Sequence, residues 1–378
     1  MDTNHTVLIR GRSIWDKELM PASEFEERVA KIRSRMAAAG LDALLVYGDA
    51  YCYGSLCYVS GFIPKTRDGI VILPKDEQPV LVASSGSRDL PFITTLTWQG
   101  DVRATMKIVP ATVACLASLG LSGASLGLVG AEERMAATNF EALQKALLEA
   151  KLVEATSIID EMRIAKSWRE LKVIQEAAQI VSDAMAFARD RVRPGIAEYE
   201  LLAEVERFAR YRGVEDFRFL IAPAATAAYG LRTAGERRIE PNDTLLIYLA
   251  ASYLRYWAEI GRTVGLNRQS ALVDVVTGAQ RRIVNDIRPG VVARKTIDGA
   301  RDLLSKAGAQ AASEAYGFGN GIGLDAHEKP VLAPDESRAL VPGMVLSVRA
   351  GSYKVGEGGA FVSDVVAVTK SGCQVLTR

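Results

Sequence analysis

The segment from Thr244 to Val264, TLLIYLAASYLRYWAEIGRTV, constrains the fold more than any other part of this sequence. It contains an apolar run from Leu245 to Leu249 and a second run, rich in aromatic and β-branched residues, from Tyr253 to Val264. Two such runs with a polar break between them are typical of two strands joined by a turn. The pattern predicts a β-hairpin with Tyr248 on one arm and Glu259 on the other, both able to point into one cavity.

The first part of the chain alternates between helical and strand patterns. Apolar residues recur at helical spacing between Pro21 and Gly40, with Ser23 as the expected N-cap, and a continuous apolar run follows from Leu41 to Gly48. This alternation predicts a small α/β domain. A fresh amphipathic pattern that starts near Glu161 predicts a long helix and a second domain. The expected domains are residues 1–158 and 159–378.

The second part carries further helical patterns at residues 198–212, 271–287 and 295–306, and a strand pattern at 216–225. Arg-Pro-Gly occurs at residues 193–195 and again at 288–290, in matching places after a helical stretch. Pro and Gly end helices, so each tripeptide is expected to stop the helical stretch before it.

Composition and charge bear on the partners and the location of the protein. The formal net charge of +1 gives no electrostatic footprint for nucleic acid or for an anionic membrane, and no apolar run reaches the length of a membrane-spanning helix. The N-terminal residues lack the apolar core of a signal peptide. The four cysteines are scattered, which favours reduced thiols and a cytoplasmic protein.

Four motifs together resemble the pita-bread, M24-like family of creatinase, aminopeptidase P, prolidase and methionine aminopeptidase. They are the hairpin segment, GFGNGIGLDAHEKP at residues 317–330, VPGMVLSVRAG at 341–351 and GEGGAFVSDVVAVT at 356–369. The resemblance implies an α/β (α+β) fold. A small N-terminal creatinase-like domain would precede a C-terminal pita-bread catalytic domain.

The metallopeptidases of this family bind metal ions through five side chains: two aspartates, one histidine and two glutamates. The resemblance places these ligand positions on residues of other types, which are Tyr248, Glu259, Asn320, Arg349 and Ser363. A divalent ion needs carboxylates and imidazole, and a guanidinium keeps its positive charge in practice. One glutamate beside an arginine does not meet this need, so the sequence predicts a site without a metal and without a cofactor.

Within the family, creatinase is the precedent for catalysis without a metal. Its catalytic histidine falls near Leu231 here, where this chain has no histidine. We therefore expect a metal-independent enzyme of creatinase-like fold that hydrolyses a C–N bond of a small polar or anionic molecule by acid/base catalysis. Three alternatives stay open: a lyase or retro-aldol cleavage on the same site, a non-catalytic module that binds a ligand or peptide, and a metallopeptidase that uses other ligands.

Three residues are candidates for the chemistry. Glu259 would be a general base in an apolar cavity, or one half of a structural ion pair with Arg349. Tyr248 would donate a hydrogen bond or move a proton, or only fill volume. His327, in the LDAHEKP segment, is the chain's one plausible imidazole base, although a single histidine is more often structural.

Other residues are candidates for binding the substrate. Arg349 can hold a carboxylate with two parallel hydrogen bonds, and Asn320 and Ser363 occupy neighbouring ligand positions. Lys65 and Arg67 lie in SGFIPKTRDG, a region that reaches the partner's active site in creatinase-like dimers. The resemblance thus implies a homodimer, and the two cations would favour an anionic substrate. A solvated turn is the alternative for either cation.

Overall fold

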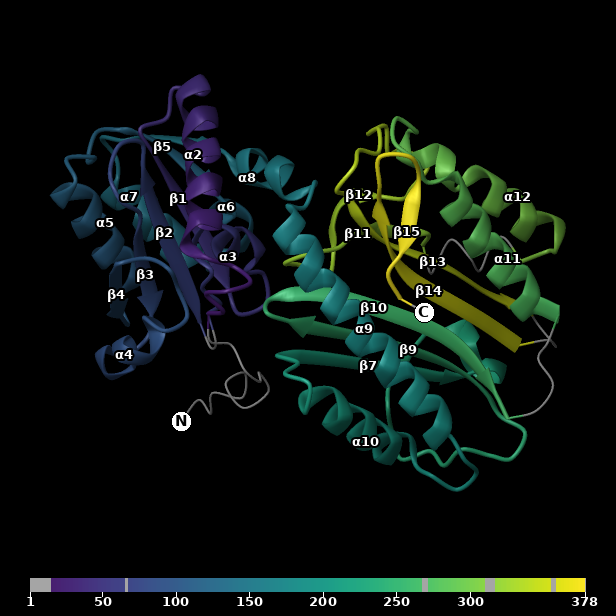
Figure 1. Ribbon diagram of the computed structural model, residues 1–378. Helices are drawn as coiled ribbons and strands as arrows, with labels where there is room; N and C mark the ends of the chain where they lie inside the picture. The colour runs from purple at the N-terminus through teal and green to yellow at the C-terminus, as the bar shows by residue number, and fades with distance from the viewer. Residues whose placement is uncertain (1–14, 65–66, 267–270, 310–316, 355–357, 378) are drawn as a thin grey trace. The chain divides into compact units, whose positions relative to one another are not determined.

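The computed structural model of the chain describes residues 15–64, 67–266, 271–309, 317–354 and 358–377 (Figure 1). It divides into two compact units, an N-terminal unit of Met1–Arg163 and a C-terminal unit of Ile164–Arg378. The boundary expected between residues 158 and 159 falls inside helix α8 (Thr156–Arg163). The last residue of this helix is also the last residue of the N-terminal unit.

The N-terminal unit is built on a six-stranded sheet with the strand order β4-β3-β2-β1-β5-β6. Every strand except β2 runs parallel to β1, because β2 pairs antiparallel with both β1 and β3 while the remaining pairs are parallel. The strands are β1 (Ala43–Asp49), β2 (Asp68–Pro74), β3 (Val80–Ser84), β4 (Asp101–Thr105), β5 (Ser125–Val129) and β6 (Lys151–Glu154).

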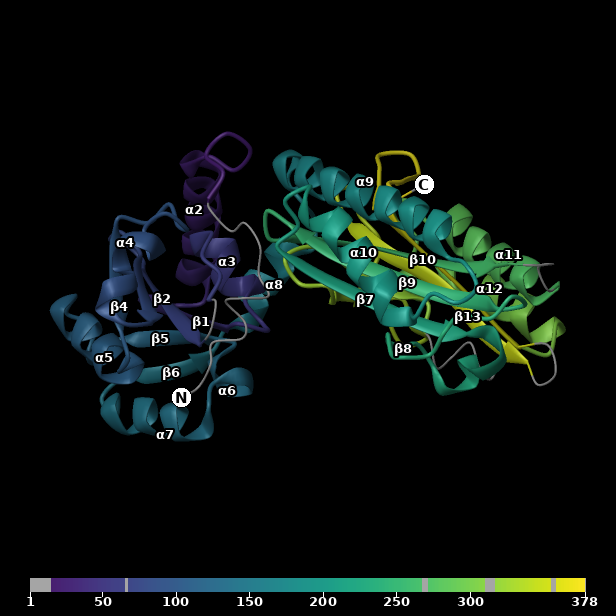
Figure 2. The same ribbon diagram turned by 90° about the horizontal axis from the view of Figure 1, so that it is seen from below.

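Helices cover this sheet, and apolar residues of α5 and α7 pack with those of β1 and β5 in one core (Figure 2). The helices are α2 (Ala22–Ala38), α3 (Gly54–Ser60), η1 (Ser87–Asp89), α4 (Leu90–Ile93), α5 (Ile108–Ser118), α6 (Ala131–Arg134), α7 (Ala137–Ala146) and α8. The prediction that Ser23 caps α2 was wrong. The cap residue is Pro21, which makes no side-chain hydrogen bond to the helix, and Ser23 lies in the first turn.

The C-terminal unit is built on a nine-stranded sheet in which every neighbouring pair is antiparallel. The strand order is β12-β11-β13-β14-β10-β9-β7-β8, and β15 pairs with β14. The strands are β7 (Asp216–Pro223), β8 (Arg232–Thr233), β9 (Thr244–Tyr253), β10 (Tyr256–Gly265), β11 (Gly319–Gly321), β12 (Glu328–Val331), β13 (Val345–Lys354), β14 (Gly358–Val368) and β15 (Cys373–Val375).

Helix α9 packs on β9 and β10, and α11 packs on β13 and β14, so that each half of the sheet has its own long helix (Figure 1). The helices are α9 (Trp168–Arg191), α10 (Glu198–Arg210), η2 (Ala224–Tyr229), α11 (Ala271–Asp286), η3 (Ala293–Thr296) and α12 (Asp298–Lys306). Within the described ranges, no helix combines the length and the apolar character needed to cross a bilayer.

The long helix expected from Glu161 onward is in fact two helices, α8 and α9. A capping box separates them: the Ser167 hydroxyl accepts from the backbone N–H of Glu170, and the Glu170 carboxylate accepts from the backbone N–H of Ser167. This exchange satisfies two N–H groups that a helix start leaves without partners. The new helix therefore begins at Trp168, after the short connection from Arg163.

The central hairpin turns at Leu254 and Arg255, not near Ser252, so β9 is longer than its sequence pattern indicates. Leu254 and Arg255 have φ values of 43° and 75°, as in the two-residue turns that match the twist of a hairpin. The Arg255 N–H donates to the Glu215 carboxylate at 2.8 Å, and the Arg255 side chain pairs with the same group at 3.4 Å. These contacts hold two non-glycine residues in a left-handed conformation.

Candidate active site

The strand register brings residues far apart in the sequence into one row across the sheet. Tyr248 pairs with Gly261, Gly261 with Ser363, and Ser363 with Arg349. Directly paired residues project from the same face of a sheet. Alternate residues of β13 and β14 belong to the core that includes α11, so this row occupies the face away from that helix.

Glu259 is the centre of a buried hydrogen-bond network on this face, and its side chain is 1% exposed. The Tyr248 hydroxyl donates to Oε2 at 2.8 Å, and the Ser363 hydroxyl donates to Oε1 at 2.9 Å. The Ser347 hydroxyl also donates to Oε1. Sequence reasoning missed Ser347, although its place two residues before Arg349 on the same strand indicates that it shares this face.

Arg349 connects Glu259 to Asn320. Its Nη1 lies 3.7 Å from the Glu259 Oε1, and its Nη2 donates to the Asn320 carbonyl. Asn320 in turn donates to the main-chain carbonyls of Gly321 at 2.7 Å and Ala326 at 3.0 Å. The buried Nε–H of Arg349 has no acceptor among the described residues. Arg349 thus forms the expected ion pair with Glu259, and its Nε–H is a hydrogen-bond donor that the described residues leave unused.

A cavity of about 440 Å³ opens beside this network. Three of the expected site residues line it, namely Asn320, His327 and Arg349. The lining also includes residues just before β11 and a residue of β12. His327 directly precedes β12. The neighbouring Glu328 forms a buried ion pair with Lys166 at 2.6 Å, which fixes the backbone next to the imidazole.

The environment sets the protonation of two site residues. Burial lowers the pKa of His327 below its ordinary value of 6.5, the nearby Arg349 and Arg218 lower it further, and Glu259 opposes them. Burial also raises the pKa of Tyr248 well above 10, and the adjacent Glu259 carboxylate adds to this. Near neutral pH, His327 is thus a neutral proton acceptor and Tyr248 keeps its proton.

Arg218 is a second residue that sequence reasoning missed. It pairs with Ala250 on β9, which pairs with Glu259, so it projects from the site face. Its guanidinium carbon lies 4.4 Å from the centre of the Trp257 ring, a distance typical of a cation–π contact. No motif marks Arg218, because its role depends on the pairing of β7 with β9.

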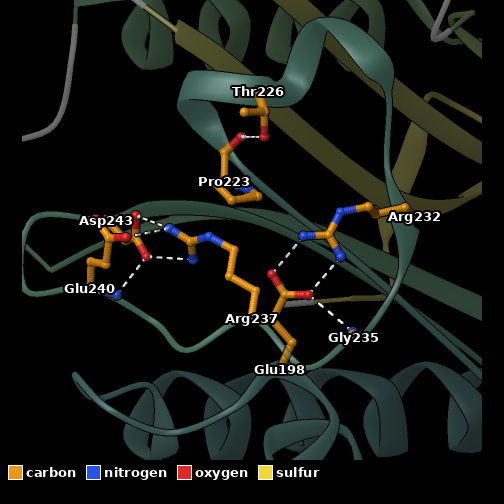
Figure 3. Close-up of polar contacts among 8 residues, drawn as sticks. All are labelled: Glu198, Pro223, Thr226, Arg232, Gly235, Arg237, Glu240 and Asp243. Carbon is orange, nitrogen blue, oxygen red and sulfur yellow. Dashed lines mark hydrogen bonds and ion pairs between the residues drawn. The ribbon is translucent and has the colours of Figure 1, made fainter.

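Two ion pairs hold the segment that leads into β9 (Figure 3). Arg232 reaches the fully buried Glu198 of α10 with two hydrogen bonds of 2.6 and 2.8 Å, and the Gly235 N–H adds a third at 3.1 Å. Arg237 binds Asp243 with two hydrogen bonds of 2.8 and 2.9 Å. These paired contacts fix the start of the strand that carries Tyr248.

Of the remaining two candidates, the structure describes one. Lys65 lies outside the described residues. Arg67 belongs to the N-terminal unit, where it lines a different cavity. The five residues at the ligand positions all belong to the C-terminal unit and form one network there.

The five residues do not fit a divalent metal ion. Glu259 supplies the one carboxylate among them, and its oxygens already accept from Tyr248, Ser347 and Ser363. The Arg349 cation lies 3.7 Å from the same carboxylate, where a second positive charge would be repelled. In the part of the chain that the structure describes, no three His, Cys, Asp or Glu side chains are grouped so that they could hold a metal.

Both units match known families. Residues 172–370 match the Metallopeptidase family M24, and residues 28–165 match the Creatinase/Prolidase N-terminal domain. The Xaa-Pro dipeptidase of Pyrococcus horikoshii is 29% identical over 256 residues, which cover 66% of this chain and 73% of that protein. The prolidase structure from Pyrococcus horikoshii has a TM-score of 0.82 at 25% identity, over 93% of this chain and 98% of that chain. An Xaa-Pro dipeptidase structure from Bacillus anthracis has a TM-score of 0.82 at 26% identity, over 94% and 98%.

These comparisons contradict the reaction expected from the sequence. The three similar proteins named above are dipeptidases or prolidases, and the matching family is one of metallopeptidases. Metal-independent cleavage of a C–N bond in a small polar or anionic molecule was therefore the wrong expectation, as were a lyase and a non-catalytic binding module. That expectation was drawn from the absence of metal-ligand residue types at most of the five ligand positions. Such an absence does not by itself show which reaction an enzyme catalyses. The coarser prediction of a hydrolase is confirmed, because peptidases are hydrolases.

The expected fold class is also confirmed. A creatinase-like α/β domain precedes a pita-bread domain, and prolidase structures superpose on more than nine tenths of the chain. The peptidase match alone, residues 172–370, spans more than half of the 378 residues. This chain belongs to metallopeptidase family M24.

Proposed function

We propose that this protein is a hydrolase of small peptides, with Xaa-Pro dipeptides as the first candidate substrates. Family membership and the named activities of similar proteins support this substrate class. The observation that carries the proposal is the cavity of about 440 Å³ that joins Asn320, His327 and Arg349. Its volume falls in the range of small-molecule sites.

Arg349 is the proposed anchor for the substrate. Its guanidinium borders the cavity and keeps one buried Nε–H without an acceptor among the described residues. A dipeptide carries a terminal carboxylate, which suits the planar fork of an arginine. The Asn320 carbonyl accepts a hydrogen bond from Nη2 of Arg349 and so fixes the orientation of the guanidinium toward a substrate.

The other residues have proposed roles that follow from their protonation and contacts. His327 is neutral near pH 7 and can accept a hydrogen bond from a group bound in the cavity that it lines. Tyr248 keeps its proton and donates to Glu259. Glu259 and Ser363 are buried behind the cavity, and we assign them to the positioning of Arg349 and Tyr248.

We also propose that the protein is a homodimer and works in the cytoplasm. The resemblance to creatinase-like dimers supports the first statement. All four cysteines are free thiols, which is typical of a reducing compartment and supports the second. Light scattering after size-exclusion chromatography gives the subunit number. Fractionation of cells that express the full chain gives the location.

The test is release of free amino acids from a panel of Xaa-Pro dipeptides, with Xaa-Ala dipeptides beside them. Each assay is run on purified protein, on chelator-treated protein, and after supply of Mn²⁺, Co²⁺ or Zn²⁺. We expect hydrolysis that Glu259→Gln lowers at least tenfold and that Glu176→Gln, an exposed change on α9, leaves unchanged. Failure of folded protein to cleave any dipeptide in all of these conditions would overturn the proposal.

A further inference from the structure

We propose that the N-terminal unit contains a second ligand site, for a small organic anion with an apolar or aromatic body. The site is a cavity of about 1160 Å³ whose lining residues all come from this unit. The inference does not depend on the peptidase activity proposed above. It rests on the position of the cavity, its unused donors and its apolar wall.

The cavity lies at the carboxyl edge of the parallel strands. Its lining includes Asp49 at the end of β1, Ser84 at the end of β3, and Lys107, which follows β4. In the sheet, β2, β3 and β4 follow one another outward from one edge of β1, and β5 and β6 follow outward from its other edge. The strand order thus reverses between β1 and β5. In α/β sheets, ligands bind beyond the carboxyl ends of the strands at such a point.

Cationic side chains exceed carboxylates in this lining. Neither Arg67 nor Lys107 has a partner for its charged group among the described residues, and Arg134 donates to the Cys52 sulfur at 2.8 Å and pairs with Glu133 at 3.3 Å. Two carboxylates oppose these three cations, and both already accept hydrogen bonds. They are Asp49, which accepts from two backbone N–H groups, and Asp68, which accepts from Tyr47.

Uncharged donors add to this positive end. Helix α5 has 11 residues and begins at the cavity, where the first-turn N–H groups of Ile108 and Val109 have no intrahelical acceptor. Ser84 is only 8% exposed and lines the same cavity. Across the described ranges, its hydroxyl has no hydrogen-bond partner. A bound anion could accept a hydrogen bond from this hydroxyl, which faces the cavity and is not paired within the described residues.

The opposite wall of the cavity is apolar. Its lining there consists of small side chains of α5 and α7, which include Val113, Ala114, Ala117, Ala142 and Ala146. At the rim, Tyr51 is 81% exposed and Met106 is 54% exposed. Exposed apolar side chains gathered at one hollow are typical of a binding surface. The ligand class is therefore an anionic group joined to an apolar or aromatic body.

The experiment uses the full chain and three aromatic probes of similar size: phenyl phosphate, phenylacetate and neutral benzyl alcohol. Titration calorimetry measures saturable binding, and thermal unfolding measures the shift in Tm. We expect at least one anionic probe to bind and to raise Tm, and benzyl alcohol to do neither. The comparison of phenyl phosphate with phenylacetate tells whether the site takes a phosphate or a carboxylate.

Two variants test where the anion binds. The double variant Ser84→Ala/Lys107→Gln removes the Ser84 hydroxyl and one cation of the lining, and should weaken binding about tenfold or more. Ala114→Trp fills the apolar wall from an exposed helix position and should abolish binding while dipeptide hydrolysis is unchanged. Lys145→Gln on α7 is the matched control, because Lys145 is exposed and does not line the cavity.

Two results would overturn the proposal. One is the absence of saturable binding of either anionic probe at millimolar concentration. The other is equal binding by the parent chain, the double variant and Ala114→Trp, which would place the anion elsewhere. Loss of dipeptide hydrolysis in the parent chain would not affect the conclusion, so the two proposals fail separately.

Discussion

Arg349 lies between a buried carboxylate and a cavity, and this position determines its chemistry. Its side chain is 14% exposed and that of Glu259 is 1% exposed, so the pair is largely removed from water. A guanidinium in such a place keeps its charge and needs acceptors on several sides. Glu259 and Asn320 provide two of these acceptors, and the guanidinium also borders the cavity, where a ligand could provide another.

Arg349→Lys should raise the KM for a dipeptide about tenfold and change kcat less. An ammonium keeps the charge, but it cannot hold a carboxylate with the two parallel hydrogen bonds of a guanidinium. Steady-state kinetics on folded protein measures the effect, and Arg294→Lys, at an exposed position in η3, is the control. An unchanged KM would remove Arg349 from substrate binding.

His327 should make the stability of the protein depend on pH. Its folded-state pKa is lowered below 6.5, so the unfolded chain takes up a proton more readily than the folded one. The contribution to stability is therefore complete above the unfolded pKa of 6.5 and is lost as the pH falls through the folded value. Urea unfolding between about pH 7 and pH 5 should show a smaller loss of stability for His327→Gln than for the parent chain. An equal loss in both proteins would contradict this.

At the scale of elements, the site depends on the close approach of β10 to β14. Gly261 faces Phe361 and Ser363 of β14, and a Cβ at this glycine would lie 2.3 Å from the Phe361 ring and 3.1 Å from the Ser363 Cβ. Both distances are shorter than a normal packing contact. A glycine at this point lets Ser363 reach Glu259 from the neighbouring strand.

Gly261→Ala should lower the free energy of unfolding by about 1–3 kcal/mol, because the added methyl overfills a packed contact. The control is Gly278→Ala in α11, where a Cβ meets no atom within 4 Å. There the change should raise stability by about 0.4–1 kcal/mol, because alanine has less freedom in the unfolded chain. Both values come from urea unfolding. A Gly261 variant as stable as the parent would mean that β14 can move away from β10.

At the scale of the whole molecule, the site exists only when the large sheet is assembled. The five ligand positions come from β9, β10, β11, β13 and β14, between residues 248 and 363. On β9, β10 and β13, the residues on both sides of these positions are core residues of the C-terminal unit. The site is thus a property of the complete unit and not of any one motif.

Replacement of the five residues by the ligand types of the metal-binding relatives should create a metal site. The combined variant is Tyr248→Asp, Glu259→Asp, Asn320→His, Arg349→Glu and Ser363→Glu, which supplies four carboxylates and one imidazole. Elemental analysis after dialysis should show more retained Mn²⁺ or Co²⁺ than in the parent chain or in Arg349→Glu alone. No gain in a folded variant would mean that the five positions do not converge as the register indicates.

Local patterns predicted much of this architecture. The strand expected at residues 216–225 and the helices expected at 198–212 and 271–287 each start at the first residue of β7, α10 and α11 and end within two residues of them. Errors occurred where a contact between side chain and backbone decided the outcome. The capping box at Ser167 and Glu170 divides one helix pattern into two helices, and Glu215 holds the turn at Leu254 and Arg255.

The sequence by itself determined the fold family and the order of the elements. These follow from apolar periodicity and from motifs, which are local properties of the chain. Only the tertiary structure decided what surrounds the residues at the five ligand positions. Ser347 reaches Glu259 across 88 positions, and Arg218 shares its face only because β7 pairs with β9. Strand register and burial are long-range properties, so the hydrogen-bond partners of Glu259, the protonation of His327 and the open side of Arg349 could not be derived from any single segment.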